Sequence, residues 1–231
     1  MSFNLQWPWI GVMLAVVLLA LLFLTRLFRS AGIASRWHDP SWLAVFGLVL
    51  YIAHQFEEHG IDLQGARYAF RGEMCRVMGY AHAVSCPIPE SFITAVNVGS
   101  VWGACMLAWL LGRRRPLVAL SAYGIALVNA LTHIVTALRQ HAYNPGLVTA
   151  IVLFLPAGLW ALRVSLRAGI GGRGVFAIIA GGVLTHAVLV GSLLAYLHGW
   201  VAAQMLVAIQ LVNMGAALAA VLVLCPARNK S

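Results

Sequence analysis

Seven long apolar runs follow one another along this chain of 231 residues and leave little sequence between them. Each run approaches the ~20 residues that a helix needs to cross a hydrocarbon layer of ~30 Å. The runs are continuous rather than alternating, and only helices or closed barrels satisfy every backbone polar group in lipid, so helices are expected. The sequence therefore predicts an all-α membrane protein, a bundle of about seven transmembrane helices forming a single domain over residues 1–231. The runs cover residues 8–25, 42–57, 91–111, 117–138, 147–165, 175–197 and 201–224.

Charge is scarce in this chain and unevenly placed. Only 9% of the residues are charged, against roughly 25% in ordinary soluble domains, and the formal net charge is +9. Basic residues gather after alternate runs, so the positive-inside rule predicts a cytoplasmic C-terminus, an outside N-terminus and a location in the cell inner (plasma) membrane. Because the arginines are spread over separate loops, we expect the lipid bilayer as partner and no nucleic acid. The residues behind this orientation are Arg26, Arg29, Arg36, Arg113, Arg114, Arg115, Arg163, Arg167, Arg173, Arg228 and Lys230.

The segment 59–90 is the longest stretch between two runs, and the charge rule places it outside. Its middle, residues 64–80, mixes basic with aromatic and aliphatic side chains, which is typical of a short amphipathic helix on the membrane interface. An ordered loop packed across the mouth of the bundle explains the same pattern equally well. The segment also contains Cys75 and Cys86, which either form a disulfide in an oxidising compartment or remain two free thiols.

A histidine and two glutamates occupy the end of the second apolar run: His54, Glu57 and Glu58. On a helix they take positions i, i+3 and i+4, which share one face. Carboxylates in the hydrocarbon region are energetically costly, so an intramembrane cluster of this kind marks a functional site.

The fourth apolar run contributes further polar residues at the same depth. Counting a helical rise of ~1.5 Å per residue from the cytoplasmic side places His54 and His133 about 20–24 Å across the membrane. Glu57 and Glu58 fall at about 24 Å, Asn129 at about 18 Å, and the outer end of the third run lies in the same layer. We therefore expect an outward-facing polar pocket between the second, third and fourth runs. The polar residues that share one helical face of the fourth run are Asn129, Thr132, His133, Thr136 and Gln140.

Three short motifs link these residues to a known family. Residues 54–58 read His-Gln-Phe-Glu-Glu, residues 129–133 read Asn-Ala-Leu-Thr-His, and residues 143–146 read Tyr-Asn-Pro-Gly. In this order they resemble the motifs of the HXXEE membrane-protein family, although the last one is by itself typical of a turn. The resemblance covers about residues 40–165 and implies a multi-spanning domain suspected of enzymatic activity. The runs at 8–25, 175–197 and 201–224 lie outside it.

Imidazole nitrogens combined with carboxylate oxygens suit zinc first, with iron and manganese as alternatives. We therefore expect His54, Glu57, Glu58 and His133 to bind a divalent metal. Three protein ligands leave a position open for water, and the remaining glutamate, Glu57 or Glu58, then serves as general base. Asn129 completes the expected catalytic set by orienting a substrate carbonyl or a metal ligand. The leading function is a membrane-embedded metal-dependent enzyme, a hydrolase, acting on a lipid or lipophilic small molecule.

Other functions use the same residues and stay open. In a proton-coupled transporter, Glu57 and Glu58 are the protonatable sites, although no internal repeat supports that class. A di-metal iron oxidase uses about four carboxylates and two histidines, whereas the run supplies two acids at this depth. An ion-paired structural cluster and a non-catalytic interaction subunit are the remaining alternatives.

Two further histidines are expected to be structural. His186 lies about 17 Å deep on the sixth run, where a hydrogen bond with Gln210 or Asn213 of the seventh run would satisfy it. His59 follows the second run and lies at the interface with water, where a histidine needs no special partner.

Overall fold

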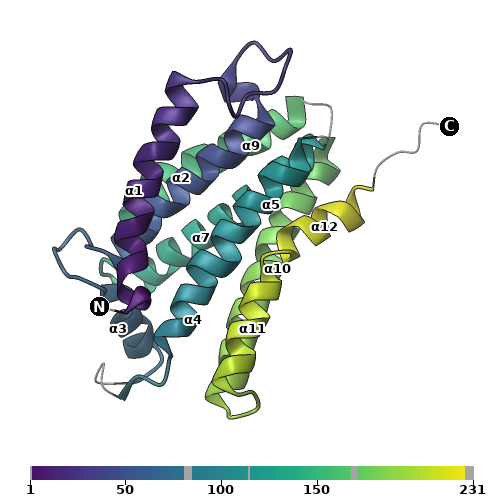
Figure 1. The fold of residues 1–231 in the computed structure, drawn as a ribbon. Coiled ribbons are helices and arrows are strands. Elements are labelled where there is room, and N and C mark those ends of the chain that lie inside the picture. Colours follow the sequence, from purple (N-terminus) through teal and green to yellow (C-terminus); the bar gives the residue numbers. More distant parts are fainter. Residues whose placement is uncertain (1, 81–84, 114, 168–170, 227–231) are drawn as a thin grey trace.

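The computed structural model describes residues 2–80, 85–113, 115–167 and 171–226. Arg114, Arg228 and Lys230, which entered the predicted orientation, lie outside the described residues. Within them the chain is helical, apart from its turns and an isolated β-bridge between Ile61 and Arg67 (Figure 1). The elements are α1 (Phe3–Leu24), η1 (Arg36–His38), α2 (Pro40–His59), α3 (Ala69–Val77), α4 (Glu90–Thr94), η3 (Ala95–Trp102), α5 (Gly103–Gly112), α6 (Pro116–Ala119), α7 (Ala122–Gln140), α8 (Leu147–Thr149), η4 (Ala150–Phe154), α9 (Leu155–Arg167), α10 (Gly171–Leu197), α11 (Ala203–Asn213) and α12 (Ala216–Leu224).

Several consecutive elements join into longer helical rods. They run from Glu90 to Gly112, from Pro116 to Gln140 and from Leu147 to Arg167. Together with α1 and α10, these rods make five helices in the described part of the chain that are long and apolar enough to cross a membrane. The number rises to six if α11 and α12, which meet at an angle of 43°, form one broken span. The chain thus has the helices of a multi-pass membrane protein.

The predicted span at 42–57 is present as helix α2, but α2 is not among these five. Its last turns carry His54, Gln55, Glu57 and Glu58, and these polar side chains lower its mean hydropathy. The all-helical fold is confirmed for the described residues, with five to six helices able to cross a membrane, while the number of seven spans and the orientation of the termini stay predictions.

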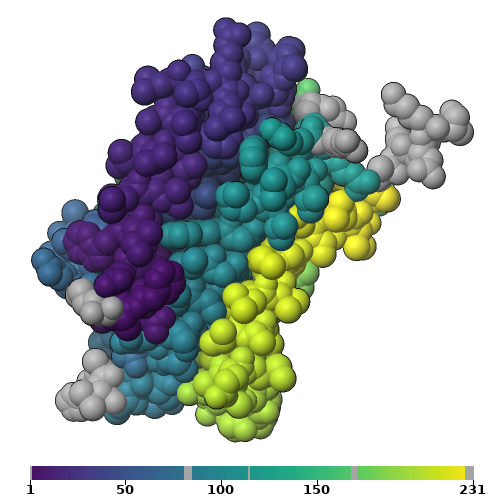
Figure 2. All heavy atoms as spheres, viewed as in Figure 1, coloured from purple at the N-terminus to yellow at the C-terminus, as the bar shows by residue number. Residues whose placement is uncertain are grey.

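Helix α2 is the central helix of the bundle, with 16 of its 20 residues buried. It packs against α1 on one side and against α5, α7 and α9 on others. Its first turn begins in a standard way: the Asp39 carboxylate accepts a hydrogen bond from the Ser41 backbone N–H at 3.0 Å, and Pro40 takes the first helical position. On the face shown in Figure 2, α1 (purple) and α11–α12 (yellow) lie at opposite margins, with α4 and α5 (teal) between them.

Helices α7 and α10 touch backbone to backbone at one point and separate beyond it. A side chain on Gly124 would overlap the Ile178 carbonyl oxygen, and one on Gly182 would overlap the Gly124 carbonyl oxygen, so glycine is required at this crossing. Beyond it, Figure 1 shows the two helices diverging. The end of α7 meets α3 through the Arg76–Gln140 hydrogen bond of 3.1 Å. The space between the diverging ends contains the cavity described below.

The amphipathic helix predicted within residues 64–80 is α3, which also packs across the end of the bundle. Its Arg71 guanidinium donates to the carbonyl oxygens of Ile88 at 2.8 Å and Cys86 at 3.2 Å. Cys75 of α3 forms a disulfide with Cys86, so the paired alternative for these cysteines is confirmed. Both predicted roles of the segment therefore apply, because an amphipathic helix covers the mouth of the bundle.

The disulfide predicts a simple result from thiol labelling of the denatured, unreduced protein. Cys105 and Cys225 are free, so two thiols should react before reduction and four after it. Closing a loop between residues 11 positions apart should raise the free energy of unfolding by about 3 kcal/mol in the chain-entropy description. Four reactive thiols before reduction would contradict the bond, and the Cys105→Ser variant is the control that should lower both counts by one.

Candidate metal centre

Three buried side chains from two helices meet near one end of the bundle. His54 and Glu58 are one turn apart on α2, and His133 comes from α7. Glu58 Oε1 lies 3.5 Å from His54 Nε2 and 3.1 Å from His133 Nε2, and one ligand atom of each residue lies within 4.8 Å of the others. The two imidazole centroids are 5.0 Å apart, as expected for rings that each place a nitrogen ~2 Å from a shared ion.

The hydrogen bond of His54 with Thr149 determines which nitrogen of His54 carries the proton. The Thr149 hydroxyl donates its proton to the Glu57 carboxylate and lies 2.9 Å from His54 Nδ1. A hydroxyl that already donates can only accept, so His54 Nδ1 carries the N–H and Nε2 keeps a lone pair. This Nε2 is buried and has no hydrogen-bond partner.

His133 is oriented in the same way by Asn144. The Asn144 Nδ2 donates to the His133 backbone carbonyl at 3.0 Å, which turns Asn144 Oδ1 toward the ring. That oxygen lies 2.6 Å from His133 Nδ1 and can only accept, so Nδ1 carries the N–H. Nε2 of the same ring points to Glu58, and in the neutral form of the ring it carries the lone pair that a metal ion would need.

The three ligand atoms could hold one divalent cation. Two ligands bound at ~2.0–2.1 Å in tetrahedral geometry are about 3.3–3.4 Å apart, and the observed separations of 3.5 and 3.1 Å from Glu58 Oε1 bracket that distance. A protonated His133 would satisfy Glu58 alone and leave His54 Nε2 without a partner. A cation satisfies both lone pairs and the carboxylate together, and the set of two imidazoles and one carboxylate suits zinc.

Glu57, predicted as a ligand or a base, does not join this group of three. Its Oε1 accepts hydrogen bonds from the Tyr143 hydroxyl at 2.9 Å and the Val148 N–H at 3.1 Å. Its Oε2 accepts from the N–H of Thr149 at 2.8 Å and from the Thr149 hydroxyl. Four donors occupy about all the lone pairs that a carboxylate offers. In this arrangement Glu57 positions Thr149, and through Thr149 it positions His54.

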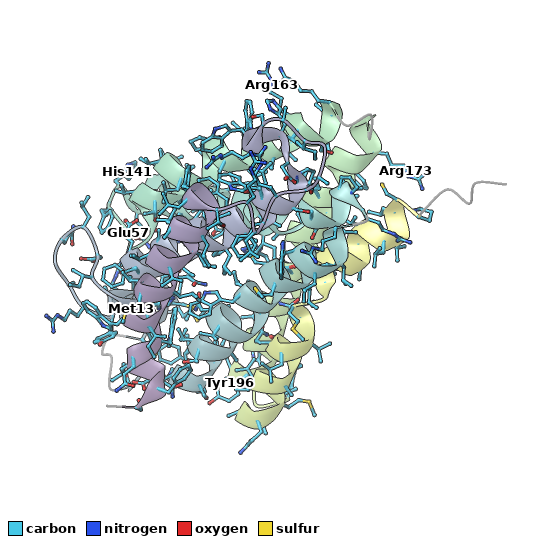
Figure 3. All side chains as sticks on the ribbon, turned by 45° about the horizontal axis from the view of Figure 1, so that its top comes forward. Met13, Glu57, His141, Arg163, Arg173 and Tyr196 are labelled. Atoms are coloured by element: carbon cyan, nitrogen blue, oxygen red, sulfur yellow. A yellow bond between two sulfur atoms is a disulfide. The ribbon has the colours of Figure 1, made fainter. Side chains whose placement is uncertain are left out.

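Tyr143 completes the environment of Glu57. Burial raises the pKa of Tyr143 above its ordinary value, and the hydrogen bond to Glu57 adds to that shift. The phenol therefore keeps the proton that it donates, while its oxygen accepts the N–H of Leu63 at 3.1 Å. Figure 3 shows Glu57 and His141 on the same flank of the molecule, away from Arg163 and Arg173.

Gly146 brings the backbone of the 143–146 segment directly onto the three ligands. Its φ is +95°, a left-handed conformation that favours glycine. A Cβ at this position would lie 2.7 Å from His133 Cε1 and 2.9 Å from both Glu58 Cγ and His54 Cε1. The turn that the sequence suggested is present, but it also encloses the centre. The sequence contained no indication of this close approach beyond the presence of the motif at residues 143–146.

A second hydrogen-bonded group connects α2 with η3 and reaches Glu58 through His59. Gln55, the second residue of the 54–58 motif, donates to Asn97 Oδ1 at 2.9 Å and accepts from the Trp102 indole at 2.6 Å. Asn97 Nδ2 lies 3.2 Å from His59 Nε2, which in turn lies 3.4 Å from Glu58 Oε2. Asn97 belongs to η3, a π-helical stretch, and such stretches are frequent at functional sites.

A cavity of about 340 Å³ adjoins the three ligands. Glu58 and His133 lie in its wall, and so does Asn129, whose Oδ1 is buried without a hydrogen-bond partner. The predicted polar face of α7 is therefore directed inward from Asn129 to Thr136. The other lining residues are His59, Phe70, Glu73, Met74, Val77, Met78, Phe92, Ile93, Val96, Asn97, Thr132, Asn144, Pro145, His186, Leu189 and Val190.

Two histidines differ from what the sequence suggested. His186 does not pair with Gln210 or Asn213: its Nδ1 lies 2.9 Å from the Gly182 carbonyl oxygen, and its ring lines the cavity. Gln210 instead donates to Ser192 at 2.7 Å, and Asn213 donates to the Thr185 carbonyl at 3.0 Å. His59 is buried against Glu58 rather than placed at an ordinary interface. Neither position could be read from the sequence, because both depend on how α10 and η3 pack.

The contact between Asn144 and His133 predicts a measurable loss of metal affinity. Asn144→Ala should weaken metal binding about 10–100-fold, because loss of the hydrogen bond to His133 Nδ1 frees the ring and its tautomer. Asn213→Ala is the matched control: both asparagines are 4% exposed, and both donate from Nδ2 to a helix carbonyl at 3.0 Å. Competition with a chelating metal indicator measures both affinities. Equal losses in the two variants would show a general effect on the fold.

Comparison with known proteins identifies the family but no characterised relative. A search of curated proteins and a search of solved structures each find no match. The sequence profile described as "Protein of unknown function with HXXEE motif" matches residues 42–161, more than half of the chain. The matched region contains all three motifs that surround the candidate metal centre. The chain therefore belongs to the family of proteins with the HXXEE motif.

Proposed function

We propose that this protein is a membrane-embedded metal-dependent enzyme, a hydrolase, that acts on a lipid or lipophilic small molecule. The observation that supports it is the convergence of two imidazole nitrogens and one carboxylate oxygen beside a largely apolar cavity. A zinc ion bound by three protein ligands keeps a position open for water and lowers the pKa of that water to ~7. Iron and manganese stay alternatives for the same ligands.

In this proposal each residue of the site has a separate role. His54, Glu58 and His133 bind the ion, and Glu57 positions His54 through Thr149. Asn129, which lines the cavity, would orient the substrate. Hydrolysis of an ester adds one water molecule: the acyl carbon gains the hydroxyl oxygen, the C–O bond to the alcohol breaks, and the alcohol oxygen takes the proton.

The carboxylate side chains near the centre favour one metal ion rather than two, because two of them already have other partners. Glu57 is fully hydrogen-bonded, and Glu73 forms a bidentate ion pair with Arg76 at 2.6 and 2.9 Å. A di-metal iron centre would need both carboxylates as further ligands. In the proton-coupled carrier, Glu57 and Glu58 would take up protons in turn, and the four donors around Glu57 favour its charged form instead.

An ester with a long acyl chain tests the hydrolase directly. Purified protein in detergent should hydrolyse 4-nitrophenyl laurate, lose that activity on treatment with a chelator and regain it with added zinc. The Glu58→Gln variant should lose both metal and activity. Turnover that survives chelation, or metal-loaded protein that releases no nitrophenol, would contradict the proposal. Proton uptake into liposomes containing metal-free protein would favour the carrier.

The location in the inner membrane and the orientation are part of the same proposal. With the N-terminus outside, the 59–90 segment and the metal centre face the outer side, where the Cys75–Cys86 disulfide is stable. A C-terminal reporter active only in the cytoplasm is the expected result. A reporter active only on the outer side would contradict this orientation and place the metal centre on the cytoplasmic side.

A further inference from the structure

The cavity beside the metal centre has two chemically different walls. The wall formed by α2 and α7 is polar and carries Glu58, Asn129, His133 and Thr136. The facing wall is contributed by α3, α4, η3 and α10 and is mostly apolar. Its apolar side chains are Phe70, Met74, Val77, Met78, Phe92, Ile93, Val96, Leu189 and Val190. A ligand that satisfies both walls must itself be amphiphilic.

The cavity wall reaches the outer surface between α7 and α10. Thr132 of α7 is exposed, and Val190 of α10 is 49% exposed, yet both line the cavity. The two helices touch at Gly124 and Gly182, and beyond that contact the exposed Thr132 and Val190 line the cavity and mark a gap between the helices. Both helices are long and apolar enough to cross a membrane, and this gap therefore faces lipid.

Helix α3 narrows the cavity at its other end, where Val77 and Met78, 56% and 38% exposed, mark a second opening. This helix places Phe70 and Met74 into the cavity, and it is tied down by the Cys75–Cys86 disulfide and by Arg71. The Phe70 ring lies 5.0 Å from the His59 ring, close to the ligands themselves. Of the two openings, the gap between α7 and α10 is flanked by helices long enough to cross a membrane, and it therefore indicates a lateral route for a ligand dissolved in lipid.

We infer that the ligand is a single-chain amphiphile with a hydroxyl group, and that it enters sideways from the bilayer between α7 and α10. This inference rests on the proposed function, since it names the class of substrate for the same site. The polar wall carries the amide of Asn129 and the hydroxyls of Thr132 and Thr136, which can pair with a hydroxyl group on the ligand. A volume of about 340 Å³ is near the lower limit of ligand pockets, ~300–1,000 Å³, which suits one chain rather than two.

A long-chain alcohol carrying a photoreactive diazirine in its alkyl chain tests the route. Protein in lipid nanodiscs is irradiated with the probe, and the labelled residues are identified by mass spectrometry. In the wild type, labels are expected on interior residues such as Met74 and Phe92. Val190→Trp fills the gap and should reduce interior labelling about tenfold, equivalent to ~1.4 kcal/mol of binding.

Matched variants separate the route from the fold and from the metal. Val183→Trp places the same side chain on α10 at a position that is 52% exposed and does not line the cavity, so interior labelling should be unchanged. Thr132→Trp on α7, with Leu131→Trp as its control, repeats the test if Val190→Trp fails to fold. Metal content should be the same in all four variants, whatever the labelling shows.

Three outcomes would overturn the inference. Labels confined to lipid-facing residues such as Leu131 would show that the alcohol does not enter. Interior labelling unaffected by Val190→Trp and Thr132→Trp would exclude the lateral gap. Interior labelling lost in Val77→Trp but retained in the other variants would assign access to the end of α3. A protein without metal that still shows the predicted labelling would contradict the proposed function and leave the lateral route supported.

Discussion

Replacing His54 or His133 with alanine should abolish metal binding while the protein still inserts and folds. Each histidine supplies one of three ligand atoms that lie within 4.8 Å of one another. Loss of a residue that is hydrogen-bonded to a metal ligand weakens metal binding ~10–100-fold, so loss of the ligand itself should weaken it by more than about 100-fold. Elemental analysis of detergent-purified protein should then find about one divalent ion per chain in the wild type and close to none in either variant.

His186→Ala is the control for these two substitutions. His186 is also an imidazole in the wall of the cavity, but its Nδ1 bonds to the Gly182 carbonyl and it is not one of the three ligands. Its metal content should therefore match the wild type. If the three variants lost metal equally, or if His54→Ala retained it, the three-ligand centre would be wrong.

Gly146→Ala should disrupt the centre without altering any ligand. The backbone strain at a φ of +95° costs about 1–2 kcal/mol for a residue with a Cβ. The new methyl group would lie 2.7–2.9 Å from carbon atoms of His133, Glu58 and His54, and such overpacking costs a further ~1–3 kcal/mol. The ligands must move apart to relieve it, so we expect a metal affinity at least about tenfold lower together with a lower thermal midpoint.

Gly199→Ala separates these two effects. Gly199 has a φ of +75°, and a Cβ there would meet nothing within 4 Å. This variant should show the cost of backbone strain alone and bind metal like the wild type. A Gly146→Ala protein with wild-type metal affinity would mean that the 143–146 turn merely ends α7 and does not enclose the centre.

Much of this site could be predicted from helical periodicity. Counting residues along two helices placed His54 and His133 at one depth, and the structure brings their rings to 5.0 Å. The polar face of α7 was predicted from the spacing of Asn129, His133 and Thr136, and all three line the cavity. These predictions held because a polar face on an apolar helix has to turn toward the protein interior.

Periodicity could not separate Glu57 from Glu58. Both lie within one turn of His54, at i+3 and i+4, but adjacent residues point ~100° apart around the helix axis. The helix that packs against each glutamate decides the role of that glutamate. Helix α7 brings His133 to Glu58, whereas Thr149 at the end of α8 donates hydrogen bonds to Glu57. That segment follows α2 by about ninety positions in the sequence, and its position depends on tertiary packing.

The most direct test of the metal centre is anomalous X-ray scattering from crystals of the wild-type protein at the absorption edge of the bound metal. We expect a single peak at ~2.0–2.2 Å from His54 Nε2, Glu58 Oε1 and His133 Nε2. The protein must be purified without chelators. If the map then shows no such peak and His133 donates a proton directly to Glu58, the central claim is contradicted. The three residues would then be an ion-paired structural cluster.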